Sequence, residues 1–375
     1  MPQTRYKAKY KLPSSPKDGS HPLYWFLALV LAGFFGWLWW RSGHAGSNRH
    51  PAIQMKVVFN SAIEKKASTS AVSPKQPAIA PEENATQQPY PRPVQNTLEA
   101  QIALISDGIS SGSLDGALGS QTRAALAAFQ RDQGLDVTGE LDAVTKSNLM
   151  LESAPFTTYT VTAEDLARLQ PIAPTWLGKS QQTALDFESI LELVSEKTFS
   201  HPNLIRRLNP EVNWSNVVAG TILQVPNARY PDDPSKAAWV TIHLASRILE
   251  AFDAETNLIA HFPCSIAKKV EKRPVGLLHV EVIAPHPNYT FDPDVFPESA
   301  EGRELHRKLI LPPGPNNPVG VAWIGLDRPG YGIHGTPRPE EVGRTESHGC
   351  FRLANWNAEF LLKIVTVGTP VYVVE

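Results

Sequence analysis

The stretch Arg344–Arg352, which reads RTESHGCFR, contains one of the two cysteines of this 375-residue chain. A thiol with the usual pKa of about 8.5 is mostly protonated at neutral pH, and the thiolate is the nucleophile, so a catalytic cysteine needs a base. His348 lies two residues before Cys350, and His334 lies sixteen residues before it in the segment YGIHGTP. Local geometry limits His348, whereas His334 is free to face the thiol from a neighbouring strand. These residue types predict covalent catalysis by a cysteine and a histidine.

The residues around Cys350 fit the same chemistry. If Cys350 lies at or just after a strand end, His348 and Arg352 point roughly to its side, because alternate residues share a face. Gly349 leaves room for a substrate backbone, and the amides of Gly349 and Cys350 are candidates for stabilising an oxyanion. Arg352 is a candidate for pairing with a substrate carboxylate or orienting the site, although Arg344 and Arg352 also suit ordinary structural ion pairs.

The segment that carries these residues, 236–375, is predicted to be a mostly antiparallel β domain with few helices. From Trp239, apolar and polar residues alternate in two runs around Asp253–Asn257, which predicts a β-hairpin. Further strand-like runs are LLHVEVIA, VGVAWIGL and PVYVVE, and a helix is predicted for NWNAEFLLKIV. Cys264 lies in a strand-like run, which is typical of a small buried hydrophobic residue, and a disulfide with Cys350 is the alternative.

The spacing of HGT and SHGCFRL, together with the segments RPVG and PGPNNPVG, resembles the YkuD-type L,D-transpeptidase catalytic domain over Trp239–Glu375. The resemblance makes Cys350 the nucleophile, His334 the general base and the Gly335 carbonyl the group that orients the imidazole. It implies that His348 supports the oxyanion or aids Cys350 electrostatically. The remaining residues that we assign to substrate binding are Ser347, Gly349, Arg352 and Arg344.

The same resemblance implies acyl transfer on bacterial peptidoglycan. Cys350 would attack the carbonyl of the third residue of a tetrapeptide stem and release D-alanine. The acyl group would then pass to an amine on another stem, giving a 3-3 cross-link, or to a D-amino acid, a lipoprotein lysine or water. His334 would take the thiol proton and return it to the leaving amine. Carbapenems are the typical covalent inhibitors of the family, and no cofactor is implied.

A small helical module is predicted for residues 95–152. Apolar residues recur there at helical spacing, which predicts three short helices around one core. The segment resembles the peptidoglycan-binding domain family, and a generic helical spacer is the alternative. The positions that match its pattern are Asp115, Gly116, Gly119, Thr122, Phe129, Gln130, Gly134, Leu135, Gly139 and Thr145.

A second module is predicted for residues 156–228, in the order strand, helix, helix, strand. With RRLNP and AGTILQVP near its end, it resembles a LysM domain, which is a glycan-binding fold. It departs from that family by a long insertion, PIAPTWLGKSQQTALDF at Pro171–Phe187. A packing or spacing role is therefore the alternative to sugar binding.

The first 41 residues predict a basic cytoplasmic tail and a membrane anchor. The apolar run Leu23–Trp40, at about 1.5 Å per residue, nearly spans a hydrocarbon core of about 30 Å, and aromatic residues cluster at its two ends. We expect a single pass through the bacterial inner membrane, with the catalytic domain in the periplasm or cell-wall space. A cleaved signal peptide is the alternative. The composition of residues 42–94 predicts a disordered linker.

The sequence as a whole therefore predicts a multidomain α+β protein. It consists of a transmembrane anchor helix, a three-helix module, a LysM-like βααβ module and a mostly-β YkuD-type catalytic domain. Its formal net charge of −2 gives no reason to expect nucleic acid as a partner. Two other functions use the same features: a zinc-dependent wall hydrolase with His334, His348 and Cys350 as ligands, and a non-catalytic peptidoglycan-binding scaffold.

Overall fold

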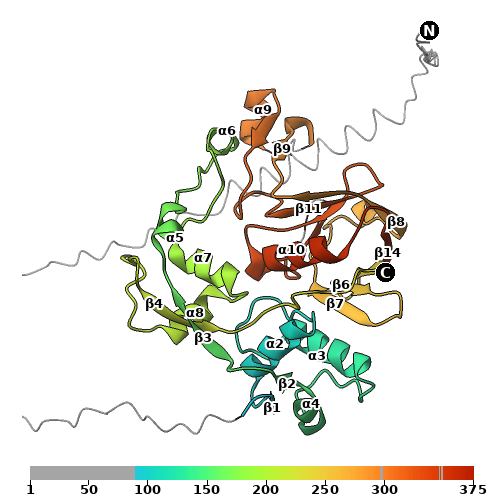
Figure 1. The fold of residues 1–375 in the computed structure, drawn as a ribbon. Coiled ribbons are helices and arrows are strands. Elements are labelled where there is room, and N and C mark those ends of the chain that lie inside the picture. Colours follow the sequence, from blue (N-terminus) through green and yellow to red (C-terminus); the bar gives the residue numbers. More distant parts are fainter. Residues whose placement is uncertain (1–88, 296–298, 346, 348) are drawn as a thin grey trace, which may run out of the picture. The chain divides into compact units, whose positions relative to one another are not determined.

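The computed structural model describes residues 89–295, 299–345, 347 and 349–375 (Figure 1). The predicted membrane anchor and most of the predicted linker lie outside these residues. Across the described ranges, no helix is both long enough and apolar enough to cross a membrane.

The C-terminal domain is built on an eight-stranded sheet with the order β13-β12-β11-β8-β14-β5-β6-β7. Its strands are β5 (Trp239–His243), β6 (Ile248–Phe252), β7 (Leu258–Pro263), β8 (Gly276–Pro285), β11 (Ala322–Leu326), β12 (Gly332–His334), β13 (Phe351–Arg352) and β14 (Pro370–Val374). Most neighbours are antiparallel, as predicted, but β12 pairs with β13 and β14 pairs with β5 in parallel. The first of these parallel pairs brings the segment before β13 beside β12.

The run that begins at Trp239 forms three strands instead of the predicted hairpin. The hairpin around Asp253–Asn257 is present as β6 and β7, but the chain also turns at residues 244–247, between β5 and β6. Arg247 takes the left-handed conformation there, with φ of 57°. The turn, LASR, contains no glycine or proline, so the alternating pattern runs through it without a break signal.

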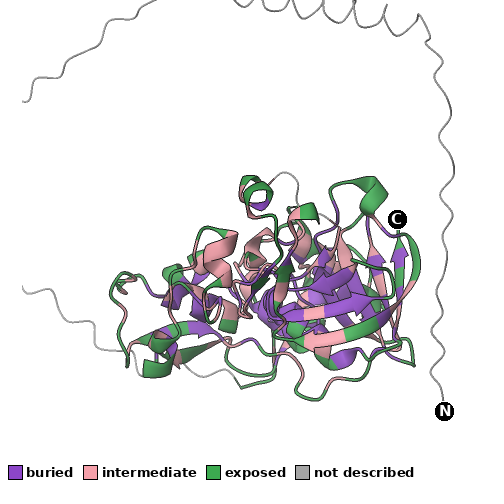
Figure 2. Ribbon diagram, turned by 90° about the horizontal axis from the view of Figure 1, so that it is seen from above, coloured by how far each residue is buried: buried purple, intermediate pink, exposed green. Residues whose placement is uncertain are grey.

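The segment after β7 joins the two ends of the sheet. Ser265 forms an antiparallel bridge with Arg352, and Ala267 forms a parallel bridge with Ser347. Helix α10 (Asn355–Ile364) packs on the sheet, and its Ala358, Leu361 and Ile364 enter the core. In Figure 2 the buried residues are concentrated in this sheet. The catalytic segment is therefore fixed by a closed, well-packed β core.

The N-terminal module contains three helices around one core, as predicted: α2 (Thr97–Ser106), α3 (Ser120–Asp132) and α4 (Ala143–Asn148). Residues 92–94, which we predicted as the end of the linker, are ordered. β1 (Arg92–Pro93) pairs with β2 (Met150–Leu151), and Val94 is buried in the helical core. The module therefore starts earlier than predicted, because this short strand closes one side of its core.

The helical module contains two similar glutamine clusters. The Gln101 side chain accepts from the amides of Asp115 and Gly116 and donates to Thr122. Gln130 in turn accepts from the amides of Thr138 and Gly139 and donates to Thr145. Each buried amide satisfies the backbone of one turn and so ties it to a helix.

The middle module begins and ends with the predicted strands, but four helices lie between them instead of the predicted two. β3 (Phe156–Thr160) pairs antiparallel with β4 (Ile222–Pro226). The helices between them are α5 (Ala163–Ala167), α6 (Trp176–Ser180), α7 (Ile190–Lys197) and α8 (Pro202–Leu208). The predicted break between the last two is the N-cap His201 followed by Pro202. Whether the module is a LysM domain stays a prediction.

The insertion in the middle module packs on an extension of the catalytic domain. This extension contains β9 (Tyr289–Phe291), α9 (Ala300–Leu305) and β10 (Leu309–Leu311), and β9 pairs with β10. Leu185 from the insertion shares a small core with Phe291, Leu309 and Leu311. The structure also contains short 3-10 turns at Val270–Lys272, Pro293–Val295 and Pro339–Glu341.

The helical module contacts the catalytic domain at β6, at β7 and near Val342. Arg131 of α3 forms an ion pair with Glu250 of β6, and Gln121 donates to the Val342 carbonyl at 2.6 Å. Ile109 forms a parallel bridge with His261 of β7.

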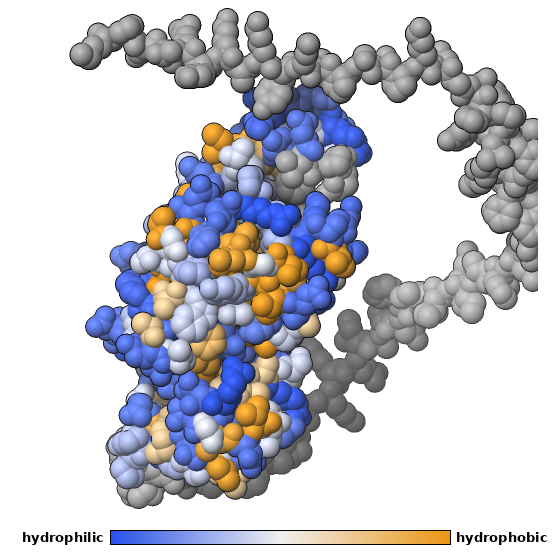
Figure 3. All heavy atoms as spheres, turned by 90° about the vertical axis from the view of Figure 1, so that its right-hand side faces the viewer, coloured by the Kyte–Doolittle hydropathy of each residue, from blue (hydrophilic) through white to orange (hydrophobic). Residues whose placement is uncertain are grey.

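On the face seen in Figure 3, apolar side chains occur in small groups among hydrophilic ones.

Candidate active site

The parallel pair β12 and β13 brings the two predicted catalytic residues into one cavity. His334 is the last residue of β12, and Cys350 directly precedes β13. The register aligns Ile333 with Phe351 and His334 with Arg352. Both His334 and Cys350 line a cavity of about 660 Å³. The two residues thus reach one cavity from neighbouring segments of the sheet, and their catalytic roles stay a prediction.

The His334 imidazole is buried and held in one orientation. Its Nδ1 lies 2.6 Å from the Gly335 carbonyl oxygen, so Nδ1 carries the proton and donates to it. The ring stacks on Trp323, with centroids 5.8 Å apart. Burial lowers the pKa of His334 to about 4; the nearby Arg352 adds to this effect, and the bond to Gly335 opposes it. At neutral pH the ring is thus uncharged, with Nε2 available to accept a proton.

The Cys350 thiol is half-buried, and its Sγ lies 3.5 Å from the Gly330 carbonyl oxygen. Burial raises the pKa of Cys350 above its usual value, while the Gly332 amide and Arg352 both favour the thiolate. At neutral pH the cavity therefore contains a protonated thiol and a neutral imidazole. Proton removal has to accompany attack, which is general-base chemistry.

The turn before Cys350 is anchored on both sides. The Ser347 hydroxyl donates to the Cys350 carbonyl at 2.5 Å, and the Gly349 amide donates to that hydroxyl at 3.3 Å. The Ser347 backbone bonds to Ile266 and Lys268 on the segment after β7, at 2.8 and 2.9 Å. Ser347, predicted to bind substrate, lines the cavity and also braces the nucleophile.

Asn355 is a site residue that the sequence analysis missed. Its Oδ1 accepts from the Thr336 amide at 3.0 Å and from the Val321 amide at 3.4 Å. A Cβ on Gly335 would lie 2.3 Å from this oxygen, so the close approach requires glycine at the position that holds the histidine. Asn355 therefore fixes the backbone of the HGT segment. The available signal was an asparagine at the start of the predicted helix, three residues after Arg352.

The other predicted site residues fall into three groups. Gly349 and Arg352 line the cavity with Cys350, and burial lowers the pKa of Arg352. Arg344 is exposed and lines a different small cavity, together with Ser120 and Gln121 of the helical module. His348 lies outside the described residues.

Four aromatic residues that the sequence did not single out also line the cavity. They are Trp176, Tyr289, Trp323 and Tyr331. Burial raises the pKa of Tyr289 to about 12, and the negative charge of an ionised Cys350 adds to this effect. Their signal was weak because aromatic residues are as common in protein cores as in binding sites.

No group of three His, Cys, Asp or Glu side chains within the described ranges is arranged to hold a metal ion. The zinc set considered above includes His348, which those ranges omit. Both cysteines are free thiols, so they do not form the disulfide considered as an alternative.

A cysteine and a neutral, oriented histidine that line one cavity are the groups that covalent acyl transfer requires. The family model described as the L,D-transpeptidase catalytic domain, YkuD, matches residues 237–373, and that of the putative peptidoglycan binding domain matches residues 94–149. Residues 237–373 therefore form a YkuD-type L,D-transpeptidase catalytic domain, and residues 94–149 form a peptidoglycan-binding domain.

Curated relatives carry the same description. The putative L,D-transpeptidase YkuD of Bacillus licheniformis is 28% identical over 164 residues, covering 44% of this chain and 80% of that protein. The probable L,D-transpeptidase YbiS of Escherichia coli is 30% identical over 169 residues, covering 44% of this chain and 54% of that protein. The match thus spans only about half the length of the second relative.

Similar solved structures include an L,D-transpeptidase from Mycobacterium smegmatis. It is 17% identical, the match covers 43% of this chain and 76% of that one, and the TM-score is 0.30. The structure of LD transpeptidase LdtMt1 in complex with imipenem is 18% identical, with coverage of 42% and 76% and a TM-score of 0.29.

Proposed function

We propose that this protein cross-links or modifies bacterial peptidoglycan through a thioester on Cys350. The observation that carries the proposal is the placement of Cys350 and His334 in one cavity, with the His334 Nδ1 proton held by Gly335 at 2.6 Å. This tautomer leaves Nε2 as the acceptor for the thiol proton, and burial keeps the ring neutral over the physiological range.

The first half-reaction forms the acyl-enzyme. His334 Nε2 takes the Cys350 proton as Sγ attacks the carbonyl carbon of the third stem residue, and the carbonyl oxygen takes the negative charge. Collapse of this intermediate breaks the bond to the nitrogen of D-alanine. The imidazolium returns the proton to that nitrogen, and free D-alanine leaves.

The second half-reaction transfers the acyl group. An amine attacks the thioester carbonyl, its proton passes to His334, and Cys350 leaves as a thiolate that takes the proton back. The product is a new amide: a 3-3 cross-link when the amine belongs to another stem, or a modified stem when it belongs to a D-amino acid or a lipoprotein lysine. Water in place of the amine would give hydrolysis.

The other modules are proposed to deliver the catalytic domain to its polymer. The module at residues 94–149 would bind peptidoglycan, and the apolar run at Leu23–Trp40 would hold the protein in the bacterial inner membrane with the catalytic domain outside the cytoplasm. Membrane fractionation of the full chain, compared with a variant lacking residues 1–41, tests the anchor. Recovery of a shortened mature N-terminus would instead support a cleaved signal peptide.

Intact-mass spectrometry tests the catalytic proposal. The full-length protein is incubated with a carbapenem, and in parallel with a tetrapeptide stem while free D-alanine is assayed. We expect one carbapenem adduct and D-alanine release for the wild type and for Cys264→Ala, and neither for Cys350→Ala. An adduct of equal yield on Cys350→Ala would refute the assignment of the nucleophile.

A further inference from the structure

The insertion Pro171–Phe187 is held against the rim of the active site. The amides of Trp176 and Leu177 both donate to the Glu301 carboxylate of α9, at 2.8 Å each. The Trp176 ring stacks on Phe291, with centroids 4.4 Å apart and planes 12° apart. Together with the shared core around Leu185, these contacts make the insertion part of the catalytic cleft.

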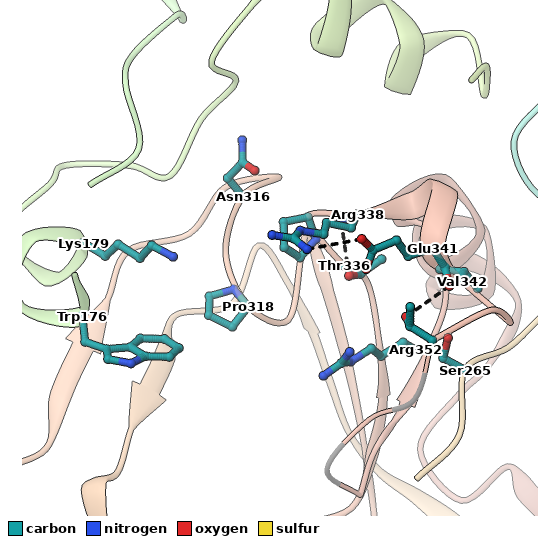
Figure 4. A pocket seen from close by; sticks show the side chains of 12 residues that line it. Trp176, Lys179, Ser265, Asn316, Pro318, Thr336, Arg338, Glu341, Val342 and Arg352 are labelled. Atoms are coloured by element: carbon teal, nitrogen blue, oxygen red, sulfur yellow. Dashed lines mark hydrogen bonds and ion pairs between the residues drawn. The ribbon is translucent and has the colours of Figure 1, made fainter. Parts of the chain in front are cut away.

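A second cavity, of about 280 Å³, adjoins the one that contains Cys350 (Figure 4). The same three side chains, Trp176, Pro318 and Arg352, line both cavities. Because Arg352 lies two residues after Cys350, a ligand in the second cavity would lie close to the reacting centre. Trp176 is contributed to this boundary by the middle module.

Positive charge predominates in the second cavity. In Figure 4 the Lys179 ammonium extends into it from the insertion, and the guanidinium groups of Arg338 and Arg352 point toward it from the other side. Glu341, the one acidic residue among the described residues that line it, lies 3.2 Å from Arg338. A carboxylate in this cavity would be attracted by these cationic side chains.

We propose that this second cavity is a carboxylate subsite for the peptide substrates, in which the middle module supplies Lys179 as a binding residue. The proposal rests on the function proposed above. Two peptide carboxylates have suitable chemistry: the terminal carboxylate of the donor, one residue beyond the bond that breaks, and the carboxylate beside an acceptor amine. In either case Lys179 and Arg352 bind the anion, and Trp176 packs against the neighbouring part of the peptide.

Substitutions of Lys179 in the full-length protein test the subsite. Lys179→Met removes the charge at similar length, Lys179→Arg keeps it, and Lys146→Met in the helical module is the matched control. The donor arm measures D-alanine release from a tetrapeptide and alaninamide release from its C-terminal amide. The acceptor arm measures incorporation of D-alanine and of D-alaninamide into a preformed acyl-enzyme.

In one of the two arms, we expect Lys179→Met to lower kcat/KM for the substrate with a free carboxylate about 5- to 10-fold, mainly by raising KM. For the amide form of that substrate, kcat/KM should stay within twofold of the wild-type value. The affected arm identifies the source of the carboxylate. The kcat/KM values of Lys179→Arg and Lys146→Met should stay within twofold to threefold of the wild-type values. Equal kinetics of wild type and Lys179→Met in both arms would overturn the subsite, while the wild-type turnover shows independently that the proposed function holds.

A different contact ties the middle module to the catalytic histidine. The Asn355 Nδ2 donates to the two carboxyl oxygens of Glu196 on α7, at 3.1 and 2.9 Å, and Asn355 Oδ1 accepts from the Thr336 amide beside Gly335. Asn355 also donates to the Pro315 carbonyl at 3.3 Å. Glu196 thus sets the orientation of the amide that fixes the backbone bonded to His334.

We infer that Glu196 is a positioning residue for catalysis, which acts on His334 through Asn355. Without the Glu196 carboxyl group, Asn355 keeps one weak acceptor and is free to rotate. The HGT backbone then loses its anchor, and the Gly335 carbonyl no longer holds the imidazole. Burial raises the pKa of Glu196 to about 8, so a neutral glutamine is a close substitute at neutral pH.

Carbapenem acylation of the full-length protein tests this role. We expect Glu196→Ala to slow acylation at least 10-fold and Glu196→Gln to stay within threefold of wild type. Asp165→Ala serves as a control, because Asp165 is buried and bonds to Lys197 and Tyr159 within the same module. It should lower the melting temperature and leave the acylation rate within twofold. A wild-type rate for Glu196→Ala, or equal slowing by Asp165→Ala, would overturn the inference.

Discussion

The two cysteines lie on segments that pair with each other, yet their surroundings differ completely. Cys264 directly follows β7, on the segment whose residues 265 and 267 bridge to Arg352 and Ser347, and it is fully buried in the β core. Cys350 directly precedes β13 and faces the cavity that His334 also lines. The same side chain is thus a core residue on one segment and a candidate nucleophile on the other.

The comparison shows that the environment of a thiol, more than its place in the sheet, decides its chemistry. Burial raises the pKa of Cys264 far above its usual range. Burial also raises the pKa of Cys350, but Arg352 and the Gly332 amide act in the opposite direction, and a neutral histidine shares its cavity. Only the second arrangement provides a route for the proton.

The largest expected effect separates the two cysteines by activity. Cys350→Ala should lower kcat for D-alanine release by at least about 10³-fold, because no other group forms the thioester. Cys264→Ala should keep kcat within twofold. Steady-state assays of both variants check this, and comparable losses in the two would remove the functional distinction between them.

Removal of the base should have the next largest effect. His334→Gln keeps a polar side chain but loses the proton acceptor, so acylation should slow by about 10² to 10⁴-fold. At pH 10, where hydroxide helps to generate the thiolate, iodoacetamide alkylates Cys350 without a histidine base. The alkylation rate of His334→Gln should therefore fall much less, relative to wild type, than its acylation rate. If carbapenem acylation is unchanged in His334→Gln, another group is the base.

The pH dependence of acylation should be unusual for a histidine enzyme. Because the pKa of His334 is lowered to about 4, the ring stays an unprotonated base at every pH above that value. The rate should fall about tenfold per unit below pH 4 and show no histidine inflection near pH 6.5. Acylation rates between pH 3.5 and 9 measure this; a midpoint between 6 and 7 would contradict the neutral buried ring.

The smallest effect concerns stability alone. Cys264→Ala removes a buried sulfur from the core and should lower the free energy of unfolding by about 1 to 2 kcal/mol. Cys350→Ala, at a half-buried position beside a cavity, should change it by less than about 0.5 kcal/mol. Urea denaturation at neutral pH gives both values, and the reverse order would mean that the two environments are misassigned.

Local sequence patterns predicted much of the architecture correctly. The three helices after residue 96, the helix break at His201 and Pro202, the hairpin β6 and β7 and the helix after the thiol all follow from periodicity, capping and turn residues. The turn between β5 and β6 was missed because its residues carry no break signal. The order of residues 92–94 was missed because it depends on pairing with Met150–Leu151.

The sequence by itself determined which groups are available for chemistry: one thiol after a glycine, a histidine before another glycine, and an arginine two residues on. Tertiary structure decided which of them meet. The parallel pairing of β12 with β13 aligns His334 with Arg352, and Asn355 and Glu196, far apart in the chain, join at the backbone that holds the histidine. The physical reason is that spacing along a chain specifies local conformation, whereas strand pairing, burial and module packing depend on contacts between distant residues.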